Sequence, residues 1–240
     1  MTPSITAIAE SPHGSRLVSF VAPTSFEADQ YRTLRHIVER LQRDSDFRAI
    51  GVTSPGPGEG KSLTTLNLGG ALAQARNRRV LVADADFRRP SVASYLGLPV
   101  DDAPGWVDLI AGNGHSLADA VRRIEWANLD VLPAGASQEG FYELLTSPRF
   151  GAVIEEARGV YDFVLVDTPP VVPVPDCRLI GKSVDGFLVV VAADKTPRRQ
   201  VAEALSMLDA EKVIGLVFNG ARRAPSSYYG YSGYYHQTNR

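Results

Sequence analysis

The stretch Ser54-Pro55-Gly56-Pro57-Gly58-Glu59-Gly60-Lys61-Ser62 decides the fold of this sequence. It follows a short apolar run at residues 49–53 and opens a segment with helical periodicity at residues 62–76. Glycines let successive backbone N–H groups turn inward around a phosphate, and a helix N-terminus adds positive potential. Lys61 can then reach the β- and γ-phosphates, and the Ser62 hydroxyl can ligate Mg²⁺. The stretch therefore predicts a phosphate-binding loop (P-loop), although Pro55 stands where the strict motif has Gly or Ala; an ordinary Gly/Pro turn is the alternative.

Further apolar runs predict the rest of a sheet. Several are rich in Val and Ile and do not alternate with polar residues, which is typical of strands buried on both faces of a parallel sheet. They lie at residues 80–83, 129–132, 163–166, 187–193 and 213–218. Helical patterns separate them, and a first helix is expected to begin near Thr24 or Ser25. We expect an α/β fold: a doubly wound, mostly parallel sheet with helices on both faces, with short helices inserted at residues 106–124.

Length and composition predict one large domain. The chain has 240 residues, of which 44% are hydrophobic and 22% charged, enough to bury a sizeable core. Residues 1–22 have mixed polarity and no period, which predicts a loosely held N-terminal arm before the domain at residues 23–220. Residues 221–240 are expected to form a flexible tail, because a segment rich in tyrosine and without aliphatic residues beyond Ala224 cannot fold alone.

The charge and apolar patterns exclude several classes of protein. A formal net charge of −2 gives no basic field for nucleic acid. The single cysteine, Cys177, cannot form an internal disulfide, which fits a reducing cytoplasm. Residues 1–16 lack the apolar core of a signal peptide, and the run at residues 187–193 is far shorter than the roughly 18–20 residues that span a bilayer. We expect a cytoplasmic protein that reaches a membrane through a partner.

Three aspartates follow apolar runs and predict a metal site. Asp84 and Asp86 come directly after residues 80–83, and Asp167 follows residues 163–166. The carboxyl ends of parallel strands share one edge of the sheet, where ligands bind. Mg²⁺ prefers oxygen ligands and often keeps several waters, so a hydroxyl, phosphates and one or two carboxylates suffice. Each aspartate alone could be a turn residue; together, after a P-loop, they predict a nucleotide and magnesium site.

These motifs resemble those of the bacterial tyrosine autokinases of exopolysaccharide and capsule systems. The resemblance covers residues 25–219 and resumes in the tail. It consists of the Ser-x-x-Pro-Gly-Glu-Gly-Lys-Ser loop, the Asp84-x-Asp86-x-Arg88 and Asp167-Thr-Pro-Pro motifs, and the terminal tyrosine cluster. It implies ATP, Mg²⁺, phosphoryl transfer to tyrosine by a non-specific protein-tyrosine kinase, and the P-loop fold of the partitioning and septum-placement ATPases.

The resemblance also implies roles for individual residues. Ser62, Asp86 and Asp167 would position Mg²⁺, and Asp84 would take the proton of the substrate tyrosine, whose phenol has a pKa of about 10. Asn219 resembles an adenine-contacting asparagine of related ATPases, although a turn residue beside Gly220 is an equal alternative. The residues expected to hold the nucleotide are Gly56, Pro57, Gly58, Glu59, Gly60, Lys61, Ser62, Leu63 and Asn219.

Homo-oligomer formation is a further implication of the family. Its N-terminal helix carries Glu-x-x-Arg-x-x-Arg and joins subunits into a ring. Asp29, Arg32 and Arg35 stand at the corresponding positions here, with an acid one methylene shorter. The alternative is a solvated helix face with i,i+3 ion pairs that contribute only a few tenths of a kcal/mol.

The tail is expected to be the substrate of another subunit. Its candidate phosphorylation sites are Tyr228, Tyr229, Tyr231, Tyr234 and Tyr235. The family also implies a membrane-embedded polysaccharide co-polymerase as activator, and a tyrosine phosphatase that reverses the modification. Because the chain opens with Met1, we expect the activator to be a separate protein rather than a removed part of this one.

Two other functions compete with the kinase. A partitioning or septum-placement ATPase switch would carry a second lysine early in the loop, where Gly56 stands, and would lack the tyrosine tail. A nucleotide-binding scaffold without turnover is the second alternative, and the intact set of Lys61, Ser62 and the three aspartates argues against it. GTP is disfavoured because no Asn-Lys-x-Asp motif occurs; Asp194-Lys195-Thr196-Pro197 does not fit.

Overall fold

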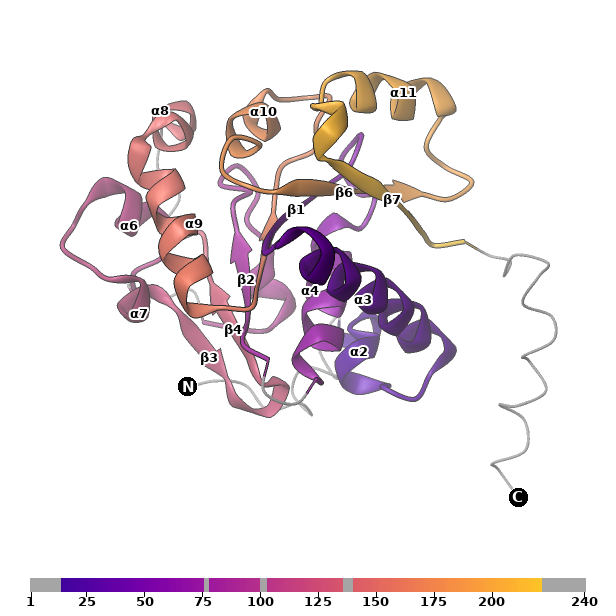
Figure 1. Cartoon of the computed structure of the whole chain (residues 1–240), viewed down its shortest axis with the longest axis horizontal. Coiled ribbons are helices and arrows are strands. Elements are labelled where there is room, and N and C mark those ends of the chain that lie inside the picture. Colours follow the sequence, from indigo (N-terminus) through magenta and orange to yellow (C-terminus); the bar gives the residue numbers. More distant parts are fainter. Residues whose placement is uncertain (1–13, 76–77, 100–102, 136–139, 222–240) are drawn as a thin grey trace.

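A seven-stranded sheet organises the chain, with the strand order β3-β4-β2-β5-β1-β6-β7 (Figure 1). The computed structural model describes residues 14–75, 78–99, 103–135 and 140–221. All neighbouring strands pair in parallel except β3, which runs antiparallel to β4. The strands are β1 (Ala49–Thr53), β2 (Val80–Asp84), β3 (Arg122–Ile124), β4 (Leu129–Leu132), β5 (Phe163–Asp167), β6 (Gly186–Ala192) and β7 (Val213–Asn219).

The predicted strands are confirmed, and so is the doubly wound α/β class. Every residue of β1, β2 and β5 is buried, as their continuous apolar sequences predict for strands covered on both faces. The edge strand β7 is half-buried and leaves Phe218 65% exposed. The centre of the sheet therefore holds the core, and the phosphate loop leaves it at the end of β1, which lies next to the central strand β5.

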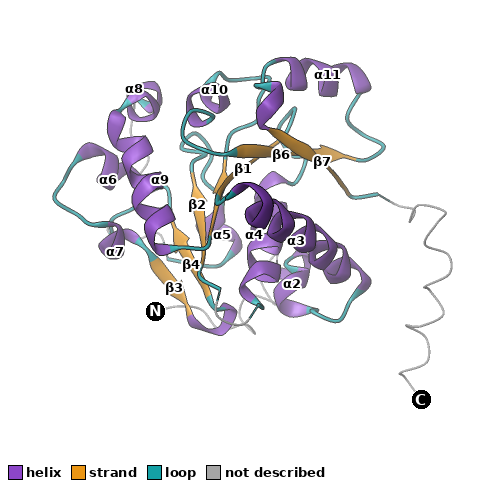
Figure 2. Cartoon of the chain, in the orientation of Figure 1, coloured by secondary structure: helices purple, strands orange, loops and turns teal. Residues whose placement is uncertain are grey.

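Helices cover both faces of the sheet (Figure 2). Helices α2 to α5 pack on one face around Leu66 and Leu72, and α6 to α11 pack on the other around Trp106 and Phe150. Their bounds are α2 (Val18–Val21), α3 (Phe26–Ser45), α4 (Lys61–Ala73), α5 (Val92–Tyr95), α6 (Trp106–Ala111), α7 (Leu117–Ala120), α8 (Phe141–Thr146), α9 (Pro148–Val160), α10 (Asp176–Ile180) and α11 (Arg198–Ser206). Short 3₁₀ turns occupy Gly14–Arg16, Glu125–Ala127 and Ala210–Lys212.

Two details set the position of α3 and α4. The Ser25 hydroxyl accepts a hydrogen bond from the Ala28 N–H, which confirms the predicted cap of α3. Within α4, a Cβ on Gly69 would lie 2.7 Å from Val82 Cγ2, so the helix packs closely on β2 because this residue lacks a side chain. This close packing fixes the N-terminus of α4 beside the carboxyl ends of β1 and β2.

The region between β2 and β4 differs in one respect from the expectation. Helices α6 and α7 confirm the short inserted helices, but Arg122–Ile124 forms strand β3. Its three residues, two of them arginines, are too few to show a strand pattern in the sequence. The pairing with β4, in which Arg123 lies opposite Asp130, is a tertiary contact that the local sequence does not encode.

The expected loose arm is wrong for residues 14–22. Leu17 is fully buried and Phe20 is 8% exposed, and both belong to the core cluster under α3 and α4. The Phe20 ring lies 2.6 Å from where a Cβ on Gly70 would be, so this glycine makes room for it. The Asn67 side chain accepts from the Ser19 N–H and donates to the Arg16 carbonyl, which ties the segment to α4.

Several predictions lie outside the described residues. These are the arm at residues 1–13 and the tail from Arg222, with its tyrosines Tyr228, Tyr229, Tyr231, Tyr234 and Tyr235. Among the helices that the structure describes, none combines the length and apolar character needed to cross a membrane.

Replacing Leu17 with alanine tests whether the N-terminal segment belongs to the domain. Because Leu17 is fully buried, we expect Leu17→Ala to lower the free energy of unfolding by about 2–5 kcal/mol in urea denaturation. Val18→Ala, at a half-buried position of the same turn, is the matched control and should cost clearly less. Equal, negligible losses in both variants would show that the segment is a loose arm after all.

Candidate functional site

The phosphate loop joins β1 to α4 in a conformation that requires glycine. Gly58 and Gly60 adopt φ values of +76° and +91°, in the left-handed region. A Cβ on Gly60 would also lie 2.1 Å from the Asn219 side-chain nitrogen, so the position is closed to any other residue. Gly60 is the N-cap of α4, which places Lys61 and Ser62 in the first turn of the helix. The loop thus has the geometry expected of a P-loop.

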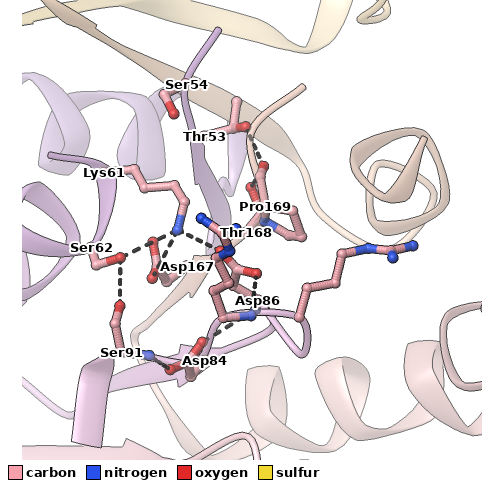
Figure 3. A network of polar contacts seen from close by, with 12 residues as sticks. Thr53, Ser54, Lys61, Ser62, Asp84, Asp86, Ser91, Asp167, Thr168 and Pro169 are labelled. Atoms are coloured by element: carbon pink, nitrogen blue, oxygen red, sulfur yellow. Dashed lines mark hydrogen bonds and ion pairs between the residues drawn. The ribbon is translucent and has the colours of Figure 1, made fainter. Parts of the chain in front are cut away.

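Lys61 lies at the centre of the polar network (Figure 3). Its Nζ is 2.8 Å from Asp86 Oδ2, 3.7 Å from Asp167 Oδ2 and 3.3 Å from Ser62 Oγ. Asp84 and Asp167 lie opposite each other in the register of β2 and β5, which explains why three acids from two strand ends meet here. The structure therefore brings together the lysine, the serine and the three aspartates that the sequence predicted.

The charges of this network depend on one another. Burial works against the Lys61 ammonium, but the carboxylates of Asp167 and Asp86 outweigh it and raise the lysine pKa above its usual value. Burial raises the pKa of Asp167 to about 6, although the neighbouring Lys61 lowers it. At neutral pH the lysine is therefore charged, and Asp167 is close to the point at which it gains a proton.

Asp84 is fully buried and holds the start of α5. Its Oδ2 accepts from the N–H groups of Ser91 at 2.8 Å and Val92 at 3.0 Å, and its Oδ1 accepts from the Asp86 N–H at 3.2 Å. Burial and the charge of Asp167 raise the pKa of Asp84 to about 7, against the effect of those N–H donors. Asp84 therefore combines a structural contact with a near-neutral pKa, a combination found at functional sites.

The site has donors that fit a hydrated magnesium ion. Asp167 Oδ2 is buried and has no hydrogen-bond partner among the described residues, while Oδ1 accepts from the Thr65 hydroxyl at 3.4 Å. Lys61 Nζ, at 3.7 Å, is too far away to donate a hydrogen bond to Oδ2, so this buried oxygen can still accept a water or contact a second cation. The Ser62 hydroxyl, bonded to the Ser91 hydroxyl at 2.9 Å, lies in the same network. Oxygen donors of this kind suit Mg²⁺.

The remaining predicted nucleotide residues have different positions. Asn219 lies beside the loop, and its Nδ2 donates to the Glu59 carbonyl at 2.9 Å. The Glu59 carboxylate instead faces the loop after β6, where Thr196 donates to it at 2.8 Å. Leu63 packs against the core under α3 and α4. The prediction that Glu59 contacts the nucleotide therefore applies to its backbone and not to its side chain.

Sequence reasoning assigned no role to two further parts of the site. Ser91 links Ser62 to Asp84, since its hydroxyl donates to the Ser62 hydroxyl and its N–H donates to the Asp84 carboxylate. The sequence feature that points to Ser91 is its position just before a helix, which is typical of an N-cap residue. Arg88 donates twice to Asp176 of α10, at 2.7 and 3.1 Å, and its guanidinium lies 5.4 Å from the centre of the Phe141 ring. These contacts tie the loop after β2 to the helices on the other side of the site.

The predicted oligomer residues are not assembled into one patch. Arg32 donates to Asp29 and to the Pro23 carbonyl within α3 and its N-terminal turn. Arg35 donates to Glu39 at 2.8 Å and to the Ala71 carbonyl at 3.2 Å, so it faces α4. Asp29 and Arg35 therefore have separate partners within one chain, and the ring stays a prediction.

Known proteins resemble both the sequence and the structure. Residues 50–231 match the family model described as "CobQ/CobB/MinD/ParA nucleotide binding domain". The tyrosine-protein kinase YwqD of Bacillus subtilis is 34% identical over 226 residues, covering 92% of this chain and 94% of YwqD. The tyrosine-protein kinase Wzc of Salmonella typhimurium is 30% identical over 93% of this chain, which spans only 31% of Wzc. The succinoglycan biosynthesis transport protein ExoP of Rhizobium meliloti is 33% identical over 82% of this chain and 25% of ExoP.

The fold comparison gives the same answer. The kinase domain of the Escherichia coli tyrosine kinase ETK superposes with a TM-score of 0.80 at 25% identity, covering 88% of this chain and 83% of that domain. The P-loop, the buried lysine and the three strand-end aspartates lie in a domain with this architecture. The chain therefore belongs to the tyrosine-protein kinases of bacteria, within the CobQ/CobB/MinD/ParA group of nucleotide-binding domains.

Proposed function

We propose that this kinase transfers the γ-phosphoryl group of ATP to tyrosines in the C-terminal cluster of another copy of the chain, with Mg²⁺ as cofactor. The observation that carries the proposal is the buried Lys61 ammonium, held between Asp86 and Asp167 at the first turn of α4. Phosphoryl transfer depends on positioning and on cations around the transferred group, and this arrangement supplies both.

Lys61 is proposed to exchange its carboxylate partners for phosphate oxygens. Its ammonium is a compact charge on a flexible four-carbon stem, so it can turn from Asp86 toward a phosphate bound in the loop. The N–H groups at the N-terminus of α4 add positive potential at the same place. Both effects stabilise the charge on the transferred phosphoryl group.

Ser62, Asp86 and Asp167 are proposed to hold the magnesium ion, directly or through water. The Oδ2 of Asp167, which accepts no hydrogen bond among the described residues, and the Ser62 hydroxyl support this assignment. When bound, Mg²⁺ neutralises phosphate charge and helps to orient the transferred group. Among the residues described here, no group of three His, Cys, Asp or Glu side chains has the geometry of a metal site by itself, so phosphate oxygens and waters would complete the coordination.

Asp84 is proposed to accept the proton of the tyrosine hydroxyl. Its pKa of about 7 suits a group that must be ionised and still able to take a proton. Because its oxygens accept the N–H groups of Ser91, Val92 and Asp86, a phenol would reach it only with some rearrangement of the turn before α5. Proton transfer is the smaller part of catalysis, and positioning is the larger.

Asn219 is proposed to favour adenine over guanine. Its Nδ2 donates to the Glu59 carbonyl, which sets the orientation of the amide and leaves Oδ1 as an acceptor. The exocyclic amine of adenine is a donor, whereas guanine presents a carbonyl at the equivalent position. This arrangement supports ATP as the nucleotide.

The cellular role is proposed from the relatives. ExoP is named for succinoglycan biosynthesis and transport, and the chain spans a quarter of it. We infer a role in exopolysaccharide or capsule polymerisation or export, at the inner face of the membrane, with a membrane-embedded polysaccharide co-polymerase as activator and a tyrosine phosphatase as antagonist. A ring of copies joined through Asp29, Arg32 and Arg35 would bring one chain's tail to its neighbour's site.

Phosphosite mapping tests the proposal. After incubation with ATP and Mg²⁺, we expect the wild type to carry phosphate on some of the five tail tyrosines, and Lys61→Met to carry none, as measured by mass spectrometry. A variant with all five replaced by Phe is the matched control, and it should bind ATP but gain no tail phosphate. ATP hydrolysis without tail phosphate would instead support an ATPase switch, and binding without either would support a scaffold.

The acid cluster predicts a pH dependence. An ordinary Asp titrates near 3.8, whereas Asp167 and Asp84 titrate near 6 and 7 in the folded chain. The folded state therefore keeps these protons to higher pH than the unfolded state does, so ionisation between about pH 4 and 7 lowers the free energy of unfolding.

Urea denaturation without nucleotide measures this effect. We expect the wild type to lose stability from pH 5 to pH 8 more steeply than Asp167→Asn, which lacks one of the two groups. Binding of Mg²⁺ and ATP to the wild type should strengthen over the same range, because the ionised carboxylates hold the cation. Parallel stability curves for the two proteins would contradict the assignment of raised pKa values.

Tail phosphorylation is expected to separate the copies. The tail carries Arg222, Arg223 and Arg240 and no acid, so the remaining 220 residues have a net charge of 22 − 27 = −5. Each phosphate adds about −1.5 to −2 charges, so several would reverse the sign of the tail and repel an acidic domain. Sedimentation at matched concentration should give a larger mass for dephosphorylated chains; identical masses would contradict this prediction.

A further inference from the structure

Glu59 lies in the phosphate loop, but its carboxylate points away from the acid cluster. Oε1 accepts from the Gly56 N–H at 2.7 Å, across the loop itself. Oε2 accepts from the Ala192 N–H at 3.0 Å and from the Thr196 hydroxyl at 2.8 Å. The residue is only 6% exposed. A buried carboxylate is tolerated when donors satisfy its oxygens, and here three donors do so.

The three donors come from two separate parts of the chain. Gly56 belongs to the loop, whereas Ala192 and Thr196 lie at the end of β6 and in the turn before α11, more than 130 positions away in the sequence. That turn is itself ordered by N–H bonds from Lys195 and Thr196 to the Ala192 carbonyl and by the left-handed φ of +61° at Asp194. Glu59 therefore fastens the phosphate loop to a fixed turn of the neighbouring strand.

The backbone of Glu59 is fastened on a second side. Its carbonyl accepts from Asn219 Nδ2, at the end of β7. Gly58 and Gly60, on either side of Glu59, have left-handed φ values, so the loop would be free to adopt other conformations without these contacts. Bonds to a charged acceptor are stronger than neutral ones and hold the loop in one shape before the nucleotide arrives.

We propose that Glu59 and Thr196 form a positioning pair that pre-organises the phosphate loop for nucleotide. The inference rests on the proposed binding of ATP by this loop. Neither side chain touches the nucleotide; the pair acts through the shape of the loop between Gly56 and Gly60. The pair also connects the nucleotide site to the N-terminus of α11, a helix to which the sequence assigns no role.

Nucleotide affinity in a double-mutant cycle tests the pair. The variants are Thr196→Val, which removes the donor and keeps the shape, Glu59→Ala, which removes the acceptor, and the double variant. We expect Thr196→Val to weaken the binding of ATP with Mg²⁺ about tenfold, from the loss of one charge-assisted bond. The double variant should bind no more weakly than Glu59→Ala alone, since Glu59→Ala already removes the acceptor of the Thr196 hydroxyl. Thr196→Ser, which keeps the hydroxyl, should restore affinity.

Two controls separate positioning from general stability. Ser206→Ala removes an exposed hydroxyl at the end of α11, which is bonded to the Glu203 carbonyl, and should leave the affinity for ATP unchanged. Melting temperatures without nucleotide show whether each variant is folded when its affinity is measured. Wild-type affinity in folded Thr196→Val, or additive losses of affinity in the double variant, would contradict the proposed role of the pair and leave the proposed function untouched. Failure of the wild type to bind ATP would overturn the proposed function together with it.

Discussion

The site depends on one buried cation among three buried carboxylates. Parallel strands end at the same edge, so the topology brings the acids at the ends of β2 and β5 together, and each of Asp84, Asp86 and Asp167 is at most 3% exposed. Neighbouring carboxylates repel one another strongly where water is excluded. Lys61 and the N–H groups around Asp84 offset part of that repulsion, and protonation near neutral pH offsets more. The same concentration of negative charge at the carboxyl edge of the sheet favours the binding of a divalent cation there.

Most of the fold could be predicted because its central strands are buried on both faces, which makes them continuous apolar runs. The site could be predicted because P-loop chemistry requires glycines, a lysine and a serine in consecutive positions, and metal binding requires acids at strand ends. Strand β3 could not be predicted, since Arg122–Ile124 is stabilised only by its pairing with β4. Leu17 and Phe20 could not be assigned to the core, because α2 is a single turn and the space that Phe20 fills exists only because Gly70 has no side chain. The direction of the Glu59 side chain depends on Thr196, a contact that only the folded chain forms.

The contacts around the site divide into two kinds. Lys61, Ser62 and the aspartates gather where phosphate and metal chemistry is proposed to occur. Around them, Glu59 fastens the loop to the turn before α11, Asp84 fixes the start of α5, and Arg88 joins Asp176 on α10. Each of these contacts involves a carboxylate, and two of them, from Glu59 to Thr196 and from Arg88 to Asp176, join elements that lie far apart in the sequence. The phosphate loop and the loop after β2 are thereby held by the domain, as expected where catalysis depends on positioning.

The position of Lys61 with nucleotide bound is the most direct test of this account. A crystal structure with a non-hydrolysable ATP analogue and Mg²⁺ measures it. We expect Lys61 Nζ to leave Asp86, from which it now lies 2.8 Å, and to contact phosphate oxygens, with the metal near Ser62 and Asp167. An analogue bound elsewhere, with Lys61 still paired to Asp86 and no metal at the strand ends, would contradict the account.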